Sequence, residues 1–496
     1  MNDQAHSESE NFPLIDEAYS HQLFGELSAV WQSVLTDHLK RMQNRETPVL
    51  SCVDPHEAVR EAESFLKSSA SSSADRRGQF ADLLGQMLAH SQNLHHPGYI
   101  GHQVPASVPI AGLFDAVGSV TNQPMAIFEM GPWATAVEHA IVRQLCGRIG
   151  WDADNASGIL THGGSLANLT ALLTARNVVF PDSWENGTPS DAVLIAQSDA
   201  HYCIARSAGI LGLGTRSIVR AELDSRRRMD PERLENSIQQ LKASGRRIMA
   251  VAASACATPI GAFDPLTEIA AVCRQHGIWL HVDAAHGGGA LMSQRHRHLL
   301  KGIEQADSVV WDAHKMLFMP ALCAAVLYKN RSNRFATFHQ DAPYLFDPSS
   351  PGMAEFDGGT RTIECTKRSA GFGLWGLWSM FGADVFAQLV NRTFALAAFV
   401  YQQVESAADF SACHIPECNI VVFRYLPPHI ANQPLEIQNE FQRHVRRQLV
   451  HSGKFYIVQT TLDGVQALRL TVMNPLTTES DLIRLLNTIR EQNLLP

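Results

Sequence analysis

Charged residues are scarce in this sequence. Asp, Glu, Lys and Arg make up 18% of the 496 residues, whereas an average soluble protein has about 25%. The 49 acidic residues outnumber the 40 Lys and Arg, so the formal net charge is −9. This balance argues against a nucleic-acid-binding protein, which carries a basic patch or stripe. The 45% of hydrophobic residues excludes intrinsic disorder, and the low charge is compatible with extensive buried surface, including a subunit interface.

The sequence also lacks long hydrophobic runs. No stretch approaches the roughly 18 consecutive apolar residues of a membrane-spanning helix. The opening Met1-Asn2-Asp3-Gln4 has neither the basic start nor the apolar stretch of a secretory signal. We therefore expect a soluble, cytoplasmic protein with no membrane partner and no nucleic-acid partner.

Paired cysteine motifs are absent as well. The nine cysteines are scattered and odd in number, and none of them forms a Cys-x-x-Cys pair. This distribution argues against a disulfide framework and against a structural zinc site. We expect reduced, buried thiols and assign no metal ligands.

Three parts with different patterns follow one another along the chain. Residues 1–90 show helical spacing of apolar residues, interrupted by a serine-rich stretch at 68–73. Residues 91–370 contain short apolar runs that alternate with helices, and residues 371–496 have a mixed pattern. We predict a helical N-terminal segment, a large α/β domain and a small C-terminal α/β domain. In the last we expect a helix over 371–390, strands over 420–425 and 468–472, and a closing helix over 481–492.

The large domain is predicted from strands that alternate with helices. The apolar runs that we assign to strands are 193–196, 248–253, 278–283, 308–311 and 322–328. Such alternation implies an α/β fold with a mainly parallel central sheet and helices on both faces. In these sheets ligands bind beyond the carboxyl ends of the strands. The polar residues at those ends are therefore the candidates for chemistry.

Four features stand at or near the predicted strand ends. His314-Lys315 follows one strand, Asp283 ends another, His201 follows a third, and Gly164-Ser165 opens a helix. Together they fit pyridoxal phosphate, which needs a lysine for a Schiff base, a carboxylate for the pyridine nitrogen, a phosphate cradle and a stacking ring. Taken singly, each has an ordinary structural role as a solvated lysine, a capping aspartate, a packed histidine or a helix cap. The assignment of pyridoxal phosphate therefore depends on their occurring together.

Two longer motifs extend this constellation. His281-Val282-Asp283-Ala284-Ala285-His286-Gly287-Gly288 and Ala306-Asp307-Ser308-Val309-Val310-Trp311-Asp312-Ala313-His314-Lys315 closely resemble the pyridoxal-phosphate-dependent group II amino acid decarboxylases. That family includes glutamate, aromatic amino acid, cysteine sulfinate and 2,4-diaminobutyrate decarboxylases. The resemblance implies the fold-type I architecture of aspartate aminotransferase. It also implies a homodimer with the active site at the subunit interface and residues 1–90 as a dimerisation segment.

The resemblance implies roles for individual residues. Lys315 would be the Schiff-base lysine and Asp283 the partner of the pyridine nitrogen. His201 and Ala285 would lie against opposite faces of the cofactor ring. Further cofactor contacts are implied for Gly164, Ser165, Thr258, Asp312 and His314 and, towards the cofactor of the partner subunit, for Gly359 and Thr360.

The expected reaction type depends on Tyr344. This residue matches the mobile-loop tyrosine that protonates the carbanion after carbon dioxide leaves. Relatives with Phe at this position form aldehydes, so Tyr344 favours simple decarboxylation; a surface tyrosine with no role is the structural alternative. The resemblance thus gives Lys315, Tyr344, His201 and Asp283 as catalytic residues, and Arg469 as the arginine that holds the substrate carboxylate.

Two departures from the family pattern bear on the substrate. Asp312 stands where many members have Asn, and a carboxylate beside a phosphate is unfavourable unless it accepts backbone N–H groups. His286 stands where Trp or Tyr is common, and it either faces an acidic side chain in protonated form or fills space. These departures leave the substrate open. Gly101-His102-Gln103 and Asn122-Gln123 lie where the family shapes its substrate pocket. Their polar character favours a polar or acidic L-amino acid such as glutamate, aspartate or 2,4-diaminobutyrate. We predict His286, Gln103 and Arg469 as substrate contacts.

Other outcomes stay open at this point. The same cofactor supports transamination or oxidative deamination, and an aromatic amino acid is an alternative substrate. His281 and Asp283, two positions apart on a strand, share a face and define, with His286, a metal-dependent hydrolase as a competing class. A catalytically inactive family member that acts as a binding protein is a further possibility, against which the complete set of site residues argues.

Overall fold

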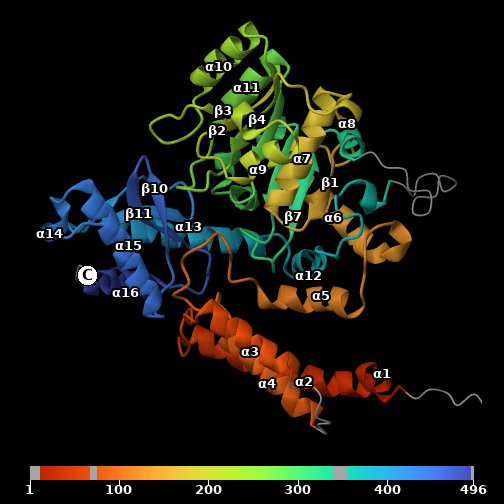
Figure 1. Cartoon of the computed structure of the whole chain (residues 1–496), viewed down its shortest axis with the longest axis vertical. Coiled ribbons are helices and arrows are strands. Elements are labelled where there is room, and N and C mark those ends of the chain that lie inside the picture. The colour runs from red at the N-terminus through yellow and green to blue at the C-terminus, as the bar shows by residue number, and fades with distance from the viewer. Residues whose placement is uncertain (1–11, 68–74, 339–354, 493–496) are drawn as a thin grey trace, which may run out of the picture.

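A seven-stranded sheet forms the centre of the computed structural model, which describes residues 12–67, 75–338 and 355–492. Along the sheet the strands follow the order β1-β7-β6-β5-β4-β2-β3 (Figure 1). Their bounds are β1 (Ser157–Thr161), β2 (Ala192–Gln197), β3 (Ile218–Ala221), β4 (Arg247–Ser254), β5 (Trp279–Asp283), β6 (Ser308–Asp312) and β7 (Ala324–Tyr328). Neighbours from β3 to β6 pair in parallel, and β7 is antiparallel to both β6 and β1. The predicted α/β fold with a mainly parallel sheet is confirmed.

Five of these strands correspond to the predicted apolar runs, whereas β1 and β3 were missed as strands. β1 has the sequence Ser-Gly-Ile-Leu-Thr, and β3 has only four residues including Arg220. Both lack the β-branched apolar run that marks the central strands. They lie at the two edges of the sheet.

Helices cover both faces of this sheet. Along β2, Leu194 and Ala196 belong to one apolar cluster with α7, while Val193 and Ile195 belong to another with α6, α10 and α11. This alternation follows from the two-residue period of a strand. The helices around the sheet are α6 (Pro132–Ile149), α7 (Gly164–Val179), α8 (Ser183–Asn186), α9 (Cys203–Ile210), α10 (Pro231–Ala243) and α11 (Leu266–His276).

The N-terminal helices lie apart from the sheet, at the bottom of the view in Figure 1. They are α1 (Pro13–Ala18), α2 (His21–Gln43), α3 (Pro55–Lys67) and α4 (Arg76–Ala89), followed by α5 (Pro109–Val120) beneath the main body. Arg45, just after α2, forms an ion pair of 2.7 Å with Asp481 near the C-terminus. This ion pair connects the N-terminal segment to the last helix of the chain. The predicted helical character of the segment is confirmed.

The C-terminal part contains a second, antiparallel sheet with the order β10-β11-β9-β8. Its elements are β8 (Phe410–Ala412), β9 (Ile420–Tyr425), α14 (Pro428–Ala431), α15 (Leu435–His451), β10 (Val458–Leu462), β11 (Val465–Thr471) and α16 (Glu479–Glu491). The predicted strands and closing helix are present as β9, β11 and α16. The helical stretch predicted over 371–390 is present, but as two helices: α12 (Phe372–Phe381) and α13 (Asp384–Glu405) meet at an angle of 98°. Gly382, with φ of +69°, ends the first of them.

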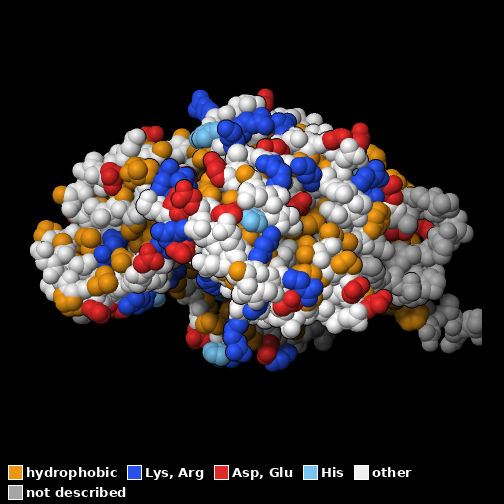
Figure 2. Space-filling view, turned by 90° about the horizontal axis from the view of Figure 1, so that it is seen from above, with side chains coloured by type: hydrophobic (Ala, Val, Ile, Leu, Met, Phe, Trp, Pro, Cys, Tyr) orange, Lys and Arg blue, Asp and Glu red, His pale blue; other side chains and the backbone are white. Residues whose placement is uncertain are grey.

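Short stretches of 3-10 helix complete the described chain. They are η1 (Phe128–Met130), η2 (Thr215–Ser217), η3 (Gly287–Met292), η4 (Arg297–Leu300), η5 (Ile303–Gln305), η6 (Arg331–Ala336) and η7 (Gly358–Thr360). Within the described ranges no single helix has both the length and the apolar character to cross a membrane, and only the bent pair α12–α13 passes when taken together. On the face shown in Figure 2, acidic and basic side chains are interspersed.

All nine cysteines are free thiols, as the sequence predicts. The expectation that they are buried holds for six, whereas Cys52 and Cys413 are exposed and Cys365 is intermediate.

Candidate active site

A cavity of about 380 Å³ opens at the carboxyl ends of the parallel strands. Most of its lining comes from the segments at the ends of β1, β2, β4, β5 and β6, because these strands all end at this edge of the sheet. Its lining residues are Gln103, His162, Gly163, Gly164, Ser165, Asn168, His201, Cys203, Ser254, Cys256, Thr258, Asp283, Ala285, His286, Asp312, His314, Lys315 and Leu322. Eleven of the fifteen residues predicted for the site are in this set.

Lys315 and two carboxylates form the charged centre of the cavity. The Nζ atom of Lys315 lies 3.2 Å from Oδ2 of Asp312, whose side chain is 1% exposed. Burial disfavours the ammonium form, but the nearby Asp312 and Asp283 outweigh it and raise the pKa of Lys315 above its ordinary value. Neither oxygen of Asp312 has a well-oriented hydrogen-bond partner among the described residues. The ion pair with Lys315 is therefore the main compensation for burying this carboxylate.

The glycines before α7 form a tight loop that faces Asp312. Gly163 has a φ of +117°, a conformation that L side chains rarely adopt. A Cβ atom added to Gly164 would lie 2.5 Å from Oδ2 of Asp312, so the backbone approaches the carboxylate more closely than any other residue would allow. Ser165 follows in the first turn of the 16-residue helix α7, where backbone N–H groups have no partner within the helix. Such a loop suits an anionic group.

A buried hydrogen-bond chain holds this loop in place. Nδ2 of Asn168 donates to the carbonyl of Gly164 at 2.9 Å, and Oδ1 of Asn168 lies 2.8 Å from Nε2 of His281. Nδ1 of His281 lies 2.9 Å from the hydroxyl of Ser308, which accepts from Nε1 of Trp279 at 2.9 Å. These partners require a neutral imidazole with its proton on Nε2. Burial, against the opposing effect of Asp283, lowers the pKa of His281 to about 4.

This chain removes the basis for the competing metal-dependent hydrolase. Both ring nitrogens of His281 are engaged, one by Asn168 and the other by Ser308. In the ranges that the structure describes, the side chains close enough to share a metal ion do not include His281 or Asp283.

His201 comes from the segment between β2 and α9 and lines the cavity. Its Nδ1 accepts the backbone N–H of Cys203 at 3.3 Å, which fixes the ring at the start of α9. Burial lowers the pKa of His201, although Asp283 opposes this effect. The structure therefore brings this ring into the same cavity as Lys315 and Asp283.

The three predicted substrate contacts occupy different positions. Gln103 and His286 line the cavity. Arg469 does not: its guanidinium is buried and donates to the backbone carbonyls of Thr258 and Pro259 at 2.8 and 3.2 Å. It therefore lies directly behind Thr258, a lining residue. Burial lowers the pKa of Arg469 to about 10.

The structure disagrees with the alternative in which a protonated His286 faces an acidic side chain. Its side chain is 3% exposed, and burial lowers its pKa to about 3. Nε2 lies 2.8 Å from Oδ1 of Asn419. The neutral, space-filling alternative agrees with these surroundings.

Besides Arg469, two predicted residues of the described chain, Gly359 and Thr360, do not line the cavity. Tyr344 falls within residues 339–354, outside the described part of the chain. Gly359 and Thr360 form η7, where the backbone N–H of Gly359 donates to Ala126 at 2.8 Å. Neither of the two faces the cavity of its own chain.

Several lining residues were missed by the sequence interpretation. His162 and Cys203 stand next to predicted residues in the chain, so proximity alone could have suggested them. His162 is held by Glu364, whose Oε1 lies 3.1 Å from its Nδ1. Cys256 and Asn168 carried no motif signal, because each is placed by a turn or helix that only the fold defines.

Comparison with known proteins identifies the family. A model described as the pyridoxal-dependent decarboxylase conserved domain matches residues 64–426. The chain belongs to this family. It is 34% identical to the acidic amino acid decarboxylase GADL1 of Bos taurus over 348 residues, which are 69% of this chain and 66% of the relative. The mouse protein of the same name is 31% identical over 462 residues, covering 90% of this chain and 83% of the relative.

A solved structure supports the same assignment for this decarboxylase. The crystal structure of mouse CSAD matches with a TM-score of 0.87 and 27% identity, covering 97% of this chain and 99% of that one. The chain is therefore a pyridoxal-phosphate-dependent amino acid decarboxylase of fold type I. The cofactor expected from the sequence is confirmed.

Proposed function

We propose that this enzyme decarboxylates an acidic L-amino acid in the cavity beside Lys315. The observation that carries the site assignment is the convergence of Lys315, Asp312, Asp283 and the Gly164 loop on one cavity. Relatives at 31% and 34% identity are named acidic amino acid decarboxylases, which supports an acidic substrate. A polar lining residue, Gln103, and the buried Arg469 behind Thr258 agree with this substrate class.

The residues present fit pyridoxal phosphate. Lys315 would hold it, and Asp283 would keep a proton on its pyridine nitrogen. The Gly164–Ser165 loop would bind its phosphate through backbone N–H groups, and His201 and Ala285 would lie against its ring. Thr258 and His314, which also line the cavity, would complete the contacts. When bound, the cofactor draws electrons from the substrate α-carbon and so promotes loss of the α-carboxylate.

The remaining groups would handle the substrate and its proton. Arg469 would orient a substrate carboxylate from its position behind Thr258: its positive charge is buried, and among the described residues its guanidinium donates to the backbone carbonyls of Thr258 and Pro259. His201, held by Cys203, would fix the plane of the reacting group and limit water access from its side. Tyr344 would return a proton to the α-carbon after carbon dioxide leaves, which gives an amine as product.

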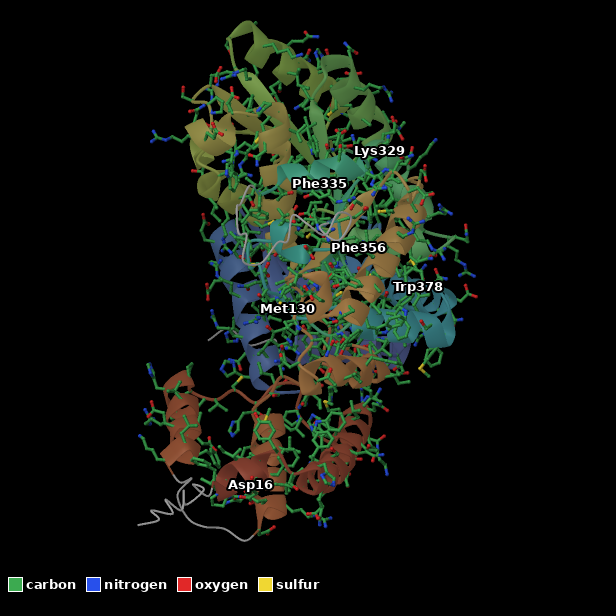
Figure 3. The ribbon with its side chains drawn as sticks, turned by 90° about the vertical axis from the view of Figure 1, so that its right-hand side faces the viewer. Asp16, Met130, Lys329, Phe335, Phe356 and Trp378 are labelled. Atoms are coloured by element: carbon green, nitrogen blue, oxygen red, sulfur yellow. The ribbon has the colours of Figure 1, made fainter. Side chains whose placement is uncertain are left out.

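We also propose that the enzyme acts as a homodimer. Apolar side chains are exposed along α5 and around η1: Ile110, Leu113, Val117, Val120, Met130 and Trp133. Met130, Phe335 and Phe356, which Figure 3 labels on one side of the molecule, are each more than a third exposed. Burying them against a second copy would contribute favourable free energy. The position of Gly359 and Thr360 outside their own cavity suits a contact with the cofactor of the other subunit.

Substrate screening tests the proposed reaction. Purified enzyme is assayed for carbon dioxide and amine with glutamate, aspartate, cysteine sulfinate, 2,4-diaminobutyrate and aromatic amino acids. We expect kcat/KM for an acidic substrate to exceed that for the aromatic ones by about tenfold or more, equal to about 1.4 kcal/mol of transition-state stabilisation. Carbon dioxide and amine in equal amounts support decarboxylation. Oxo-acid or aldehyde products would instead favour transamination or oxidative deamination.

Variants test the assigned residues. Lys315→Ala should abolish both turnover and the near-visible absorption that borohydride removes. Arg469→Gln should raise KM for the acidic substrate far more than it lowers kcat. The matched control is Arg443→Gln, since the Arg443 side chain is 39% exposed and pairs with Glu440. Turnover in Lys315→Ala, or equal behaviour of the two arginine variants, would contradict these assignments.

A further inference from the structure

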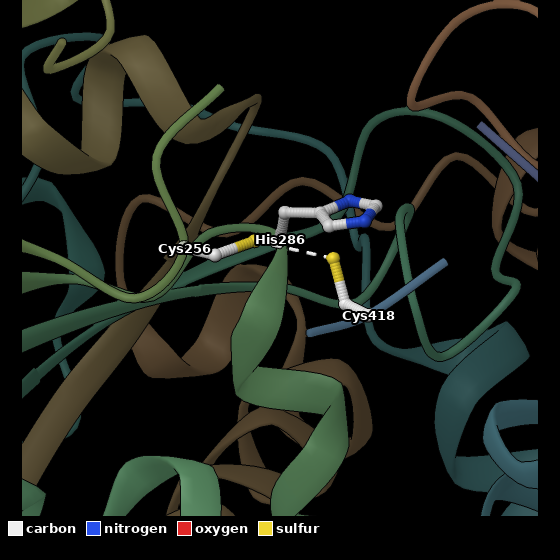
Figure 4. A group of neighbouring side chains, drawn as sticks. All are labelled: Cys256, His286 and Cys418. Atoms are coloured by element: carbon white, nitrogen blue, oxygen red, sulfur yellow. Dashed lines mark hydrogen bonds between the residues drawn. The ribbon is translucent and has the colours of Figure 1, made fainter. Parts of the chain in front are cut away.

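Two thiols and an imidazole meet at the wall of the cavity. Cys256, after β4, and His286, after β5, line the cavity, while Cys418 precedes β9 of the C-terminal sheet (Figure 4). The two Sγ atoms and a ring nitrogen of His286 all lie within 4.8 Å of one another. All three side chains are buried, with exposures of 7%, 3% and 4% in chain order. None of the three has a role in the cofactor chemistry proposed above, apart from the neutral packing of His286.

The separation of the two thiols matches a shared ligand better than a bond between them. Their Sγ atoms are 4.0 Å apart. A disulfide requires about 2.05 Å, whereas two thiolates at about 2.3 Å from one tetrahedral zinc ion lie about 3.8 Å apart. Among the described residues the thiols have only weak alternatives: the long hydrogen bond between the two Sγ atoms, and the contact of Cys418 with the carbonyl of Gly261 at 3.6 Å.

The imidazole of His286 has an unused lone pair. Nδ2 of Asn419 donates to the carbonyl of Val472 at 2.9 Å, so its Oδ1 is the acceptor for Nε2–H of His286 at 2.8 Å. Nδ1 is then unprotonated, and it is buried without a hydrogen-bond partner among the described residues. The corresponding ring of His281 has partners on both nitrogens. A histidine that donates one ring N–H to an oxygen has the outer hydrogen bond that metal-binding histidines make.

The charge balance permits a divalent ion here. A +2 ion bound by two thiolates and a neutral imidazole carries no net charge. The buried Arg469, which lies in the electrostatic surroundings of both cysteines, would therefore not repel the loaded site. Binding releases the two thiol protons to solvent. Soft sulfur ligands and a nitrogen favour Zn²⁺ over Mg²⁺ or Ca²⁺.

We propose that Cys256, His286 and Cys418 form a site for one Zn²⁺ ion, with its fourth coordination position towards the cavity. The ion would join the loops after β4 and β5 to the C-terminal sheet. It would thus crosslink that sheet, which carries Arg469 on β11, to the wall of the substrate cavity. The site does not depend on the identity of the substrate.

Metal content tests this proposal directly. The holoenzyme is produced in zinc-supplemented medium, purified with a thiol-free reductant, dialysed, and analysed by elemental mass spectrometry. We expect about one zinc per chain in the natural protein and less than about a tenth of that in Cys418→Ser. The matched control is Cys273→Ser: Cys273 is a buried thiol of α11 outside the cluster and should retain about one zinc. Retention of the visible cofactor absorption shows that each variant is folded.

Substitution with Cd²⁺ gives a second readout. Cd²⁺ added to metal-depleted holoenzyme should produce an ultraviolet thiolate-to-cadmium absorption that saturates at about one equivalent. This absorption should be lost in Cys256→Ser, which also serves if Cys418→Ser does not fold. Natural protein without stoichiometric zinc or cadmium would overturn the proposal. So would a folded Cys418→Ser that binds as much metal as the natural protein, or the loss of two titratable thiols without metal, which would indicate a disulfide.

Discussion

The ε-amino group of Lys315 lies 3.2 Å from the carboxylate of Asp312, three residues earlier in the chain. Asp312 is buried, and this ion pair is its main compensation. Asp312 thus places a second negative charge near Lys315, in addition to that of Asp283. The two carboxylates together raise the pKa of Lys315 against the opposing effect of burial.

Replacing Asp312 by Asn should lower the pKa of Lys315, because one of the two carboxylates that favour the ammonium form is removed. The readout is the pH dependence of labelling of Lys315 by an amine-directed reagent in protein freed of its cofactor. The labelling curve should move to lower pH. The control is Asp154→Asn, at a carboxylate that is 79% exposed and remote from the lysine. An unchanged curve in Asp312→Asn would show that the ion pair does not set the basicity of Lys315.

Replacing Gly164 by Ala should weaken cofactor binding. The added Cβ would lie 2.5 Å from Oδ2 of Asp312, which is buried and cannot move aside without breaking its contact with Lys315. The loop must shift, and we expect the dissociation constant for pyridoxal phosphate to rise by about tenfold or more, equal to about 1.4 kcal/mol. Spectroscopic titration of cofactor-free protein measures it.

Gly147→Ala is the matched control for this change. Gly147 is an exposed position of α6 with no atom within 4 Å of an added Cβ. Alanine is favoured over glycine in a helix by up to about 1 kcal/mol. Cofactor affinity should be unchanged and stability slightly increased. Equal cofactor affinity in the two variants would argue against a role of the Gly164 loop in binding.

A buried ion pair supports the strand that leads into this loop. Lys367 pairs with Glu138 of α6, and its Nζ also donates to the carbonyl of Leu160 in β1 at 2.9 Å. The two side chains are 1% and 5% exposed. Lys367→Met should therefore destabilise the protein by about 3 to 5 kcal/mol, because Glu138 is left buried without its partner. Denaturant unfolding followed by circular dichroism measures the loss.

The double variant Glu138→Gln/Lys367→Met distinguishes stability lost through the unpaired charge from stability lost through poorer packing. Removing both charges should restore much of the stability lost in Lys367→Met. If the double variant is as unstable as the single one, the loss arises from packing rather than from the unpaired carboxylate. Lys301→Met, at an exposed position, serves as the surface control.

The sequence could predict those site residues whose positions follow from the topology of the sheet. Asp283, His201 and Lys315 stand at or just after strand ends, and parallel strands bring their carboxyl ends to one edge. Their proximity followed from the alternation of strands and helices. The resemblance to the decarboxylases added Thr258 and Ala285, which have no signal of their own.

What could not be predicted depends on contacts between segments far apart in the chain. Cys418 reaches Cys256 because the C-terminal sheet packs against the loops after β4 and β5, and no spacing in the sequence encodes that contact. The two possible states of His286 could be separated only by its burial, which makes the neutral form strongly favoured. The break at Gly382 was also missed, since α12 and α13 share one continuous apolar pattern.

The hydrogen-bond chain through His281 makes a final prediction about acid stability. Burial lowers the pKa of His281 from 6.5 to about 4 in the folded enzyme. Because the folded pKa is below the unfolded one, the contribution of His281 is complete above pH about 6.5 and is lost as the pH falls towards about 4. Within this window one such histidine costs about 1.4 kcal/mol per pH unit. His281→Gln should therefore be less stable at pH about 7 but lose stability less steeply on acidification, as measured by denaturant unfolding at a series of pH values.

His298→Gln, at an exposed histidine, should keep the natural slope. If the slope of His281→Gln equals that of the natural enzyme, His281 is already protonated on both ring nitrogens in the folded state. The hydrogen-bond chain from Trp279 to Gly164 would then not depend on a neutral ring with its proton on Nε2.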